Sequence, residues 1–272
     1  MQHDGPNPWG SARIHRLLSG VTRTAPRHAG GGPTLAITPD LLARLVRDVP
    51  SALIAPDTRS RMRYAAVMTA AHAGLRPSEL LGSAVHRERA LLVTDIAFYE
   101  TPASTRAMPL LPPHTSADHT VLPDRFEITL GVSKADQAGD NPPIPIAAPL
   151  AVRALWVWLH VRREAFGEAD ARVFIERTLS RIVGLGIRPL CTHIADALDL
   201  AGIPHPRITG KAFRRGCASA LTAAGVATSV IAATLRHRTL SMQDRYSDAA
   251  SKAARVLAAS RAIGATPAAA RL

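Results

Sequence analysis

The stretch KAFRRGCASALTAAG, residues 211–225, joins a group of cations to a run of small residues. The threonine before it and the glycine at its end predict one helix, capped by Thr209 and ended by Gly225. Lys211 and Arg214 are three positions apart, so they lie on the same face of that helix. A solvated basic face is the simpler interpretation. The small residues favour close packing, however, which directs the two cations at one specific surface.

A second basic segment, LRHRTLSMQDRY, covers residues 235–246 and ends in one of the three tyrosines of the chain. His237 lies nine positions before Tyr246. By itself, this segment favours a helix-turn-helix surface with the tyrosine packed onto the core. The alternative is a nucleophile placed beside cations that bind phosphate. The choice between the two depends on the rest of the chain.

The composition predicts an intracellular protein that binds nucleic acid. The 272 residues carry a formal net charge of +12, and such basic surfaces attract polyanions. Arginine outnumbers lysine, and its planar guanidinium binds phosphate through two hydrogen bonds. Cys191 and Cys217 lie in apolar helical patterns that indicate neither a disulfide framework nor a zinc site. Without a secretory signal or a membrane-spanning run, we expect a nuclear location in a eukaryote and a cytoplasmic or nucleoid location in a bacterium.

The expected order is helices, a small antiparallel sheet and then helices, which defines a mainly helical α+β fold. Thr38 starts the first clear helix, Gly74 ends the second and Pro77 starts the third. From Pro149 onward we expect helices alone. The first of them, PLAVRALWVWLHVRREAF, is amphipathic, and its Trp156 and Trp158 are expected to be buried.

The sheet is predicted from two segments rich in β-branched and aromatic residues, 90–100 and 125–133. A proline-rich loop, residues 101–124, separates them and is longer than most loops. The segment KADQAGDNPPIPIA predicts a hairpin turn and a return strand. Its prolines place that strand at an edge of the sheet.

The usual signatures of other enzyme classes are absent, including GxxxxGK[ST], HExxH and GxSxG. Two further cationic motifs are present instead. AGLRPSELLG contains Arg76 and, three positions later, Glu79, a pair that a helix surface alone could explain. GVSKADQ places Lys134 at the tip of the expected hairpin, where exposed lysines are common.

Taken together, these residues resemble the catalytic domain of the tyrosine recombinases, the phage-integrase family. The family pattern corresponds to Arg76, Lys134, Arg214, His237 and Tyr246, in that order. The spacings of 23 residues from Arg214 to His237 and 9 from His237 to Tyr246 are typical of the family. The resemblance implies the tyrosine recombinase catalytic fold, which is related to that of type IB topoisomerases.

The resemblance also implies the chemistry. Arg76 and Arg214 would bind the non-bridging oxygens of a phosphodiester, and His237 would donate a third hydrogen bond. Tyr246 would attack the phosphorus and form a covalent 3′-phosphotyrosine intermediate, while Lys134 would protonate the departing 5′ oxygen. The implied enzyme is a site-specific DNA recombinase or integrase that requires neither metal nor ATP.

Further expectations follow from the family. Glu79 would support Arg76 structurally, and the partners would be double-stranded DNA and other copies of the chain in a synaptic oligomer. The alternatives are a nicking-closing enzyme of the type IB topoisomerase kind and a catalytically inactive DNA-binding remnant. We expect a catalytic domain at 38–262, a flexible tail at 263–272, and an N-terminal segment and linker at 1–37, which would be a remnant of the helical core-binding domain.

The chain departs from the family pattern at Lys211, where the family usually has histidine. Lysine occurs there in some members. A neutral Lys211 would assist the deprotonation of Tyr246, and a charged one would add a phosphate contact. The loop at 101–124 lengthens the interval between Arg76 and Lys134. The opening segment SARIHRLLSGVTR, residues 11–23, and the SKADQ turn, residues 133–137, most resemble recombinases of eukaryotic mobile elements.

Overall fold

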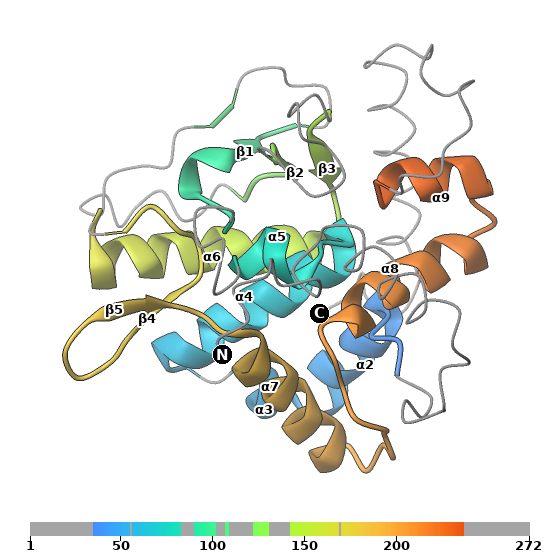
Figure 1. Cartoon of the computed structure of the whole chain (residues 1–272), viewed down its shortest axis with the longest axis horizontal. Helices are drawn as coiled ribbons and strands as arrows, with labels where there is room; N and C mark the ends of the chain where they lie inside the picture. Colours follow the sequence, from blue (N-terminus) through green and yellow to red (C-terminus); the bar gives the residue numbers. More distant parts are fainter. Residues whose placement is uncertain are drawn as a thin grey trace, which may run out of the picture. The chain divides into compact units, whose positions relative to one another are not determined.

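The computed structural model describes residues 35–54, 56–82, 90–101, 107–108, 122–130, 142–168 and 170–236, all within the unit Thr34–Leu272. In these residues, helices predominate over two small antiparallel sheets (Figure 1). The helices are α2 (Pro39–Asp48), α3 (Pro50–Leu53), α4 (Thr58–Ala73), α5 (Pro77–Leu81), α6 (Pro149–Phe166), α7 (Ile187–Leu200), α8 (Lys211–Ala223) and α9 (Thr228–Thr234). The strands are β1 (Ile96–Tyr99), β2 (Arg125–Ile128), β3 (Ile144–Ile146), β4 (Ile175–Arg177) and β5 (Ile182–Gly184), with a 3-10 turn η3 (Val93–Asp95) before β1.

The helix boundaries predicted from capping residues are confirmed at α2 and α4. The Thr38 hydroxyl accepts a hydrogen bond from the Leu41 amide at 3.2 Å, so it satisfies a donor at the start of α2. The Asp57 carboxylate accepts from the Ser60 amide at 2.9 Å at the start of α4. Gly74 ends α4 in the left-handed conformation, with φ of 57°, which glycine adopts without steric cost.

The three-stranded sheet has the order β1-β2-β3, with both pairs antiparallel, so β3 lies at an edge as predicted. In its register Phe98 is opposite Phe126, and Phe126 is opposite Ile146. Phe98 meets Trp156 of α6 edge-on, with ring centroids 4.9 Å apart. Trp156 and Trp158 are 2% and 0% exposed, so the prediction of buried tryptophans is confirmed.

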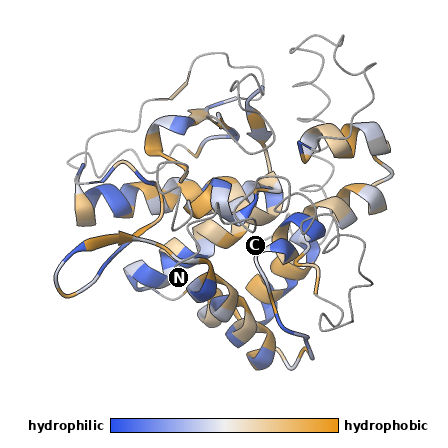
Figure 2. Ribbon diagram, viewed as in Figure 1, coloured by the Kyte–Doolittle hydropathy of each residue, from blue (hydrophilic) through white to orange (hydrophobic). Residues whose placement is uncertain are grey.

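Helix α4 lies at the centre of the core and packs against both α6 and α8 (Figure 1). Every residue from 64 to 73 is buried, and most are alanine or other small residues, which lets the neighbouring helices approach closely. Helix α6 carries hydrophobic and hydrophilic residues along its length (Figure 2), and its buried set faces α4 and the sheet. The low aromatic content of the chain therefore reflects a core of helices that pack through small side chains.

Gly216 sets how closely α8 approaches the chain before α2. A Cβ at Gly216 would lie 1.8 Å from the Ile37 carbonyl oxygen, a backbone atom that has no freedom to move aside. The Ile37 amide also donates to the Ala212 carbonyl at 3.1 Å, which fixes the two segments together. This glycine is required for space rather than for backbone freedom.

Gly216→Ala is therefore expected to destabilise the fold by about 2 kcal/mol or more, because the added methyl group overpacks the contact with Ile37. Helix propensity alone predicts the opposite sign, a gain of about 1 kcal/mol. Ser219→Ala, at an exposed position of the same helix, is the matched control and should change stability by less than about 0.5 kcal/mol. Urea unfolding of the three proteins measures both effects. A Gly216→Ala variant as stable as the unaltered chain would contradict the packing.

The expectation of helices alone from Pro149 onward is wrong between α6 and α7. Strands β4 and β5 form a hairpin there, with Ile175 opposite Gly184 and Arg177 opposite Ile182. The Thr178 amide donates to the Arg181 carbonyl at 2.9 Å and closes the turn. Each strand has only three residues, so the period-2 pattern is too short to be distinguished from a helical segment by sequence.

The prediction that Thr209 caps α8 is also wrong, because the residue at the N-cap is Gly210, whose side chain offers no acceptor. The Thr209 carbonyl instead accepts from the Ala212 amide at 2.8 Å. A Cβ at Gly210 would lie 2.4 Å from Cγ of Pro77, so glycine is required there for contact with α5. The expectations for 1–34, for most of the loop at 101–124, for the hairpin turn at 131–141 and for 237–272 lie outside the described residues. No helix in the described part is long and apolar enough to cross a membrane.

Candidate active site

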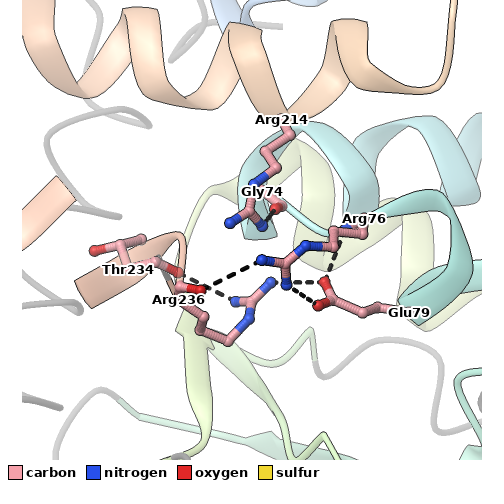
Figure 3. Close-up of polar contacts among 6 residues, drawn as sticks. All are labelled: Gly74, Arg76, Glu79, Arg214, Thr234 and Arg236. Carbon is pink, nitrogen blue, oxygen red and sulfur yellow. Dashed lines mark hydrogen bonds and ion pairs between the residues drawn. The ribbon is translucent and has the colours of Figure 1, made fainter. Parts of the chain in front are cut away.

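Arg76 lies in the short turn between α4 and α5, where it is the N-cap residue of α5. Glu79, in the first turn of α5, holds it at two points (Figure 3). The Glu79 carboxylate accepts from the Arg76 amide at 2.7 Å and from its Nη1 at 2.5 Å. The Arg76 side chain is 27% exposed and that of Glu79 only 7%. A buried carboxylate therefore fixes a guanidinium that still reaches the surface.

Arg214 reaches the same turn from α8. Its Nη1 donates to the Gly74 carbonyl at 2.9 Å, across 140 residues of sequence (Figure 3). Helix α8 can approach this turn because Gly74 has no side chain. A Cβ at Gly74 would lie 3.2 Å from Sγ of Cys217 in α8 and 2.4 Å from Cδ2 of Leu235. Cys217 is buried and unpaired, and its thiol donates to the His72 carbonyl at 3.7 Å. The structure thus brings together Arg76 and Arg214, which the sequence placed far apart.

Arg236 is a third arginine of this cluster, and no motif in the sequence predicts a role for it. Its side chain is only 4% exposed. Its Nη2 donates to Oε2 of Glu79 at 2.9 Å, and its Nη1 donates to the Thr234 carbonyl at 3.1 Å. The Arg236 carbonyl in turn accepts from Nη2 of Arg76 at 3.4 Å. We call Arg76, Arg214, Arg236 and Glu79 the arginine cluster.

Positive charge exceeds negative charge in the arginine cluster, because it holds three guanidinium groups and one carboxylate. Arg76 and Arg236 pair with Glu79, whereas Arg214 donates to the Gly74 carbonyl. Burial, reinforced by the charges of Arg76 and Arg236, lowers the pKa of Arg214 from 12.5 to about 10. Nη2 of Arg214 and Nε of Arg236 are buried and meet no acceptor among the described residues. Buried donors without acceptors are costly, so an anion with several oxygens would offset the excess charge of this cluster and accept from Arg214.

The other predicted site residues divide into two groups. Lys211 is exposed at the first position of α8, three residues before Arg214. Lys134, His237 and Tyr246 lie outside the described residues, so their roles stay predictions. In the part of the chain that the structure describes, no three histidine, cysteine, aspartate or glutamate side chains form a group that could hold a metal ion.

The other two tyrosines of the chain are engaged in structural contacts. Tyr64 is 7% exposed in α4, and burial raises its pKa to about 12. Tyr99 donates its hydroxyl to Glu127 at 3.0 Å, and Arg125 stacks on its ring with Cζ 3.8 Å from the centroid. Burial, the hydrogen bond and the charge of Glu127 together raise the pKa of Tyr99. Both hydroxyls ionise less readily than an ordinary phenol, which favours a structural role for the two side chains.

Glu79 gives the arginine cluster a pH dependence that can be measured. Burial opposes ionisation of Glu79, but the charge of Arg236 and the hydrogen bonds from Arg76 outweigh it and lower its pKa below 4.5. A lowered folded-state pKa means that the ionised carboxylate stabilises the fold above about pH 4.5, and that this contribution is lost as pH falls through the folded-state pKa.

Glu79→Gln is accordingly expected to cost about 3–5 kcal/mol at pH 7, because it leaves buried cations without a counter-charge. The difference in unfolding free energy between the two proteins should shrink as the pH is lowered from 6 towards 3. Denaturant titrations across that range measure it. A difference that stays constant with pH would show that the charge of Glu79 does not stabilise the fold.

No family model matches the chain, and no curated protein matches it. Among solved structures, the chain is similar to the XerH site-specific recombinase bound to its difH substrate in a pre-cleavage complex. The TM-score is 0.52 at 12% sequence identity, and the match covers 90% of this chain and 59% of that protein's chain. The similarity shows a recombinase-like fold, mainly helical with a small antiparallel sheet. The chain spans somewhat more than half the length of that recombinase.

Proposed function

We propose that the chain is a DNA strand transferase of the tyrosine recombinase type, which cuts and rejoins double-stranded DNA through a covalent 3′-phosphotyrosine. The observation that carries the proposal is the position of Arg76 and Arg214. They converge on one turn with an excess of positive charge and a buried N–H of Arg214 that meets no acceptor in the described part of the chain. The fold similarity to a DNA-bound recombinase supports the same function.

In the proposed reaction, the guanidinium groups of Arg76 and Arg214 bind the two non-bridging oxygens of the scissile phosphate. Negative charge grows on these oxygens as the phosphorus becomes five-coordinate, so donors that are already in place stabilise the transition state more than the ground state. The low pKa of Arg214 rises back towards its ordinary value when the anion binds. His237, which directly follows Arg236 in the sequence, donates a further hydrogen bond to the phosphate.

The phenolic oxygen of Tyr246 loses its proton to solvent or to a neutral Lys211 and attacks the phosphorus, and the bond to the 5′ oxygen breaks. Lys134 gives a proton to that oxygen, because an alkoxide is a poor leaving group. Attack by a 5′ hydroxyl on the phosphotyrosine reverses these steps and rejoins the DNA. A charged Lys211, exposed at the start of α8, would instead add a contact to a DNA phosphate.

The proposal is tested with a duplex that is nicked just beyond the cleavage site. The short fragment that carries the released 5′ hydroxyl then diffuses away, rejoining is prevented, and the covalent intermediate accumulates. We expect an adduct that survives denaturation and forms in EDTA without ATP. Transfer of the trapped strand to a second duplex would indicate recombination between copies of the chain, whereas relaxation of supercoiled DNA without exchange would indicate the topoisomerase-like alternative. Duplex binding without any adduct would indicate a DNA-binding remnant and contradict the proposal. If the activity is present, the chain acts where DNA is, in the nucleus or nucleoid.

A further inference from the structure

We propose that Arg236 is a positioning residue of the phosphate site, which balances Glu79 so that Arg76 remains available to an anion. The inference rests on the proposed function, because it assigns a role within the same site. Arg236 acts through Glu79 and Arg76 and is not assigned a contact with DNA. Its effect is exerted by charge and by the position of its backbone carbonyl (Figure 3).

The two oxygens of Glu79 accept from different guanidinium groups, and Oε2 also accepts from the Arg76 amide. Oε1 accepts from Nη1 of Arg76 at 2.5 Å, and Oε2 accepts from Nη2 of Arg236 at 2.9 Å. With Arg76 alone, the carboxylate would form a one-to-one pair with no net charge. With Arg236 the three groups carry one positive charge in excess. Arg76 is 27% exposed and Arg236 only 4%, so an incoming anion can reach the Arg76 guanidinium far more readily than that of Arg236.

The strained backbone conformation of Arg236 indicates that its side chain makes a contact that offsets the strain. Its φ is 53°, in the left-handed region, and no other described non-glycine residue has a positive φ. Glycine is the residue that adopts this conformation without cost. An arginine occupies the position despite the strain, and its guanidinium is directed into the protein, where it donates to Glu79 and to the Thr234 carbonyl.

The same residue fixes the end of α9 against α5. Its carbonyl accepts from Arg76 at 3.4 Å while its side chain holds Glu79, so both ends of Arg236 contact the same short helix turn. Leu235, just before it, is 1% exposed and packs against Gly74. His237 is the next residue in the chain, so Arg236 determines where the chain leaves the described core towards it.

The test compares Arg236→Gly, Arg236→Lys and the double variant Arg236→Gly with Glu79→Gln. Glycine fits the positive φ, so the first variant removes the guanidinium without straining the turn. We expect its cleavage rate at saturating DNA to fall about 10- to 100-fold, with little change in duplex affinity, because most phosphate contacts lie elsewhere. Arg236→Lys should recover part of the loss, since it keeps the charge but not the planar fork.

The double variant separates charge balance from simple structural support. Neutral glutamine at position 79 no longer cancels the charge of Arg76, so the double variant should cleave faster than Arg236→Gly alone. If Arg236 only supported the fold, the second substitution would leave the rate unchanged or lower it further. Arg44→Gln is the matched control, because Arg44 pairs with Asp48 at 3.2 Å on the exposed face of α2. It should cleave like the unaltered chain.

A second readout does not depend on cleavage: the binding of inorganic phosphate to the free protein, followed through the arginine side-chain NMR signals. Arg236→Gly should weaken it about tenfold, and the double variant should restore part of it. If the unaltered chain binds phosphate but forms no adduct, the proposed function fails and the role of Arg236 stands. If Arg236→Gly matches the unaltered chain in both readouts, the role of Arg236 fails alone. A chain that neither binds phosphate nor cleaves would overturn both.

Discussion

Replacement of Tyr246 by phenylalanine is expected to abolish the covalent protein–DNA adduct completely, while the affinity for duplex DNA stays close to that of the unaltered chain. The substitution removes only the oxygen that would form the bond to phosphorus. Duplex affinity should persist because phosphate contacts from lysine and arginine supply most of it. Denaturing electrophoresis of trapped reactions measures the adduct, and a filter or gel-shift assay measures binding.

The matched control is Tyr99→Phe, which also removes one phenolic hydroxyl. Tyr99 donates to Glu127 and packs under Arg125, so its loss should reduce stability by about 1 kcal/mol and leave adduct formation intact. Tyr64 is less suitable as a control because it is buried in α4. An adduct that persists in Tyr246→Phe and disappears in Tyr99→Phe would reverse the assignment.

Arg214→Gln is expected to lower the cleavage rate by about 10²–10³-fold, the usual cost of removing one donor that stabilises charge in a transition state. The rate should fall without loss of the fold. With a folded-state pKa of about 10, below its ordinary 12.5, the charged Arg214 destabilises the native state at every pH below about 10. Neutral glutamine removes that penalty, and its amide still has a donor for the Gly74 carbonyl.

Cleavage and unfolding are therefore measured on the same preparations. Arg215→Gln, at the exposed neighbouring position of α8, is the control and should leave the rate at saturating DNA near that of the unaltered chain. Arg214→Gln should be as stable as the control but far slower. An Arg214→Gln protein that cleaves at the control rate would remove Arg214 from the site. If the Arg214→Gln protein instead unfolds at neutral pH, the buried Arg214 side chain stabilises the fold rather than destabilising it.

Local signals in the sequence predicted much of the fold because they act within a few residues. Thr38 caps α2 and Gly74 ends α4, and each needs only its own turn to do so. The pairing of Arg76 with Glu79 is equally local, three positions apart along α5. The hairpin of β4 and β5 was missed because three-residue strands carry too little periodicity.

The part of the site that the sequence did not reveal depends on contacts over long distances in the chain. Arg236 pairs with Glu79 across 157 residues, and no local pattern marks an arginine that will take a positive φ. One feature of the sequence could have pointed to Arg236. Glu79 is predicted to support Arg76, and a buried carboxylate is stabilised by further cations, so a second arginine near Glu79 could be expected. Gly210 and Gly216 were likewise not predicted. Each is needed because a distant segment, at Pro77 or at Ile37, lies too close for a side chain, and helix propensity does not reveal that requirement.

The most direct test of the central claim is to identify the residue that carries the DNA. The trapped adduct is digested with nuclease and protease, and the peptide that bears the residual nucleotide is located by mass spectrometry. The account predicts a single modified peptide with the nucleotide on the phenolic oxygen of Tyr246, linked through a 3′ phosphate. A nucleotide on Tyr64, on Tyr99 or on a serine, or a linkage through a 5′ phosphate, would contradict it.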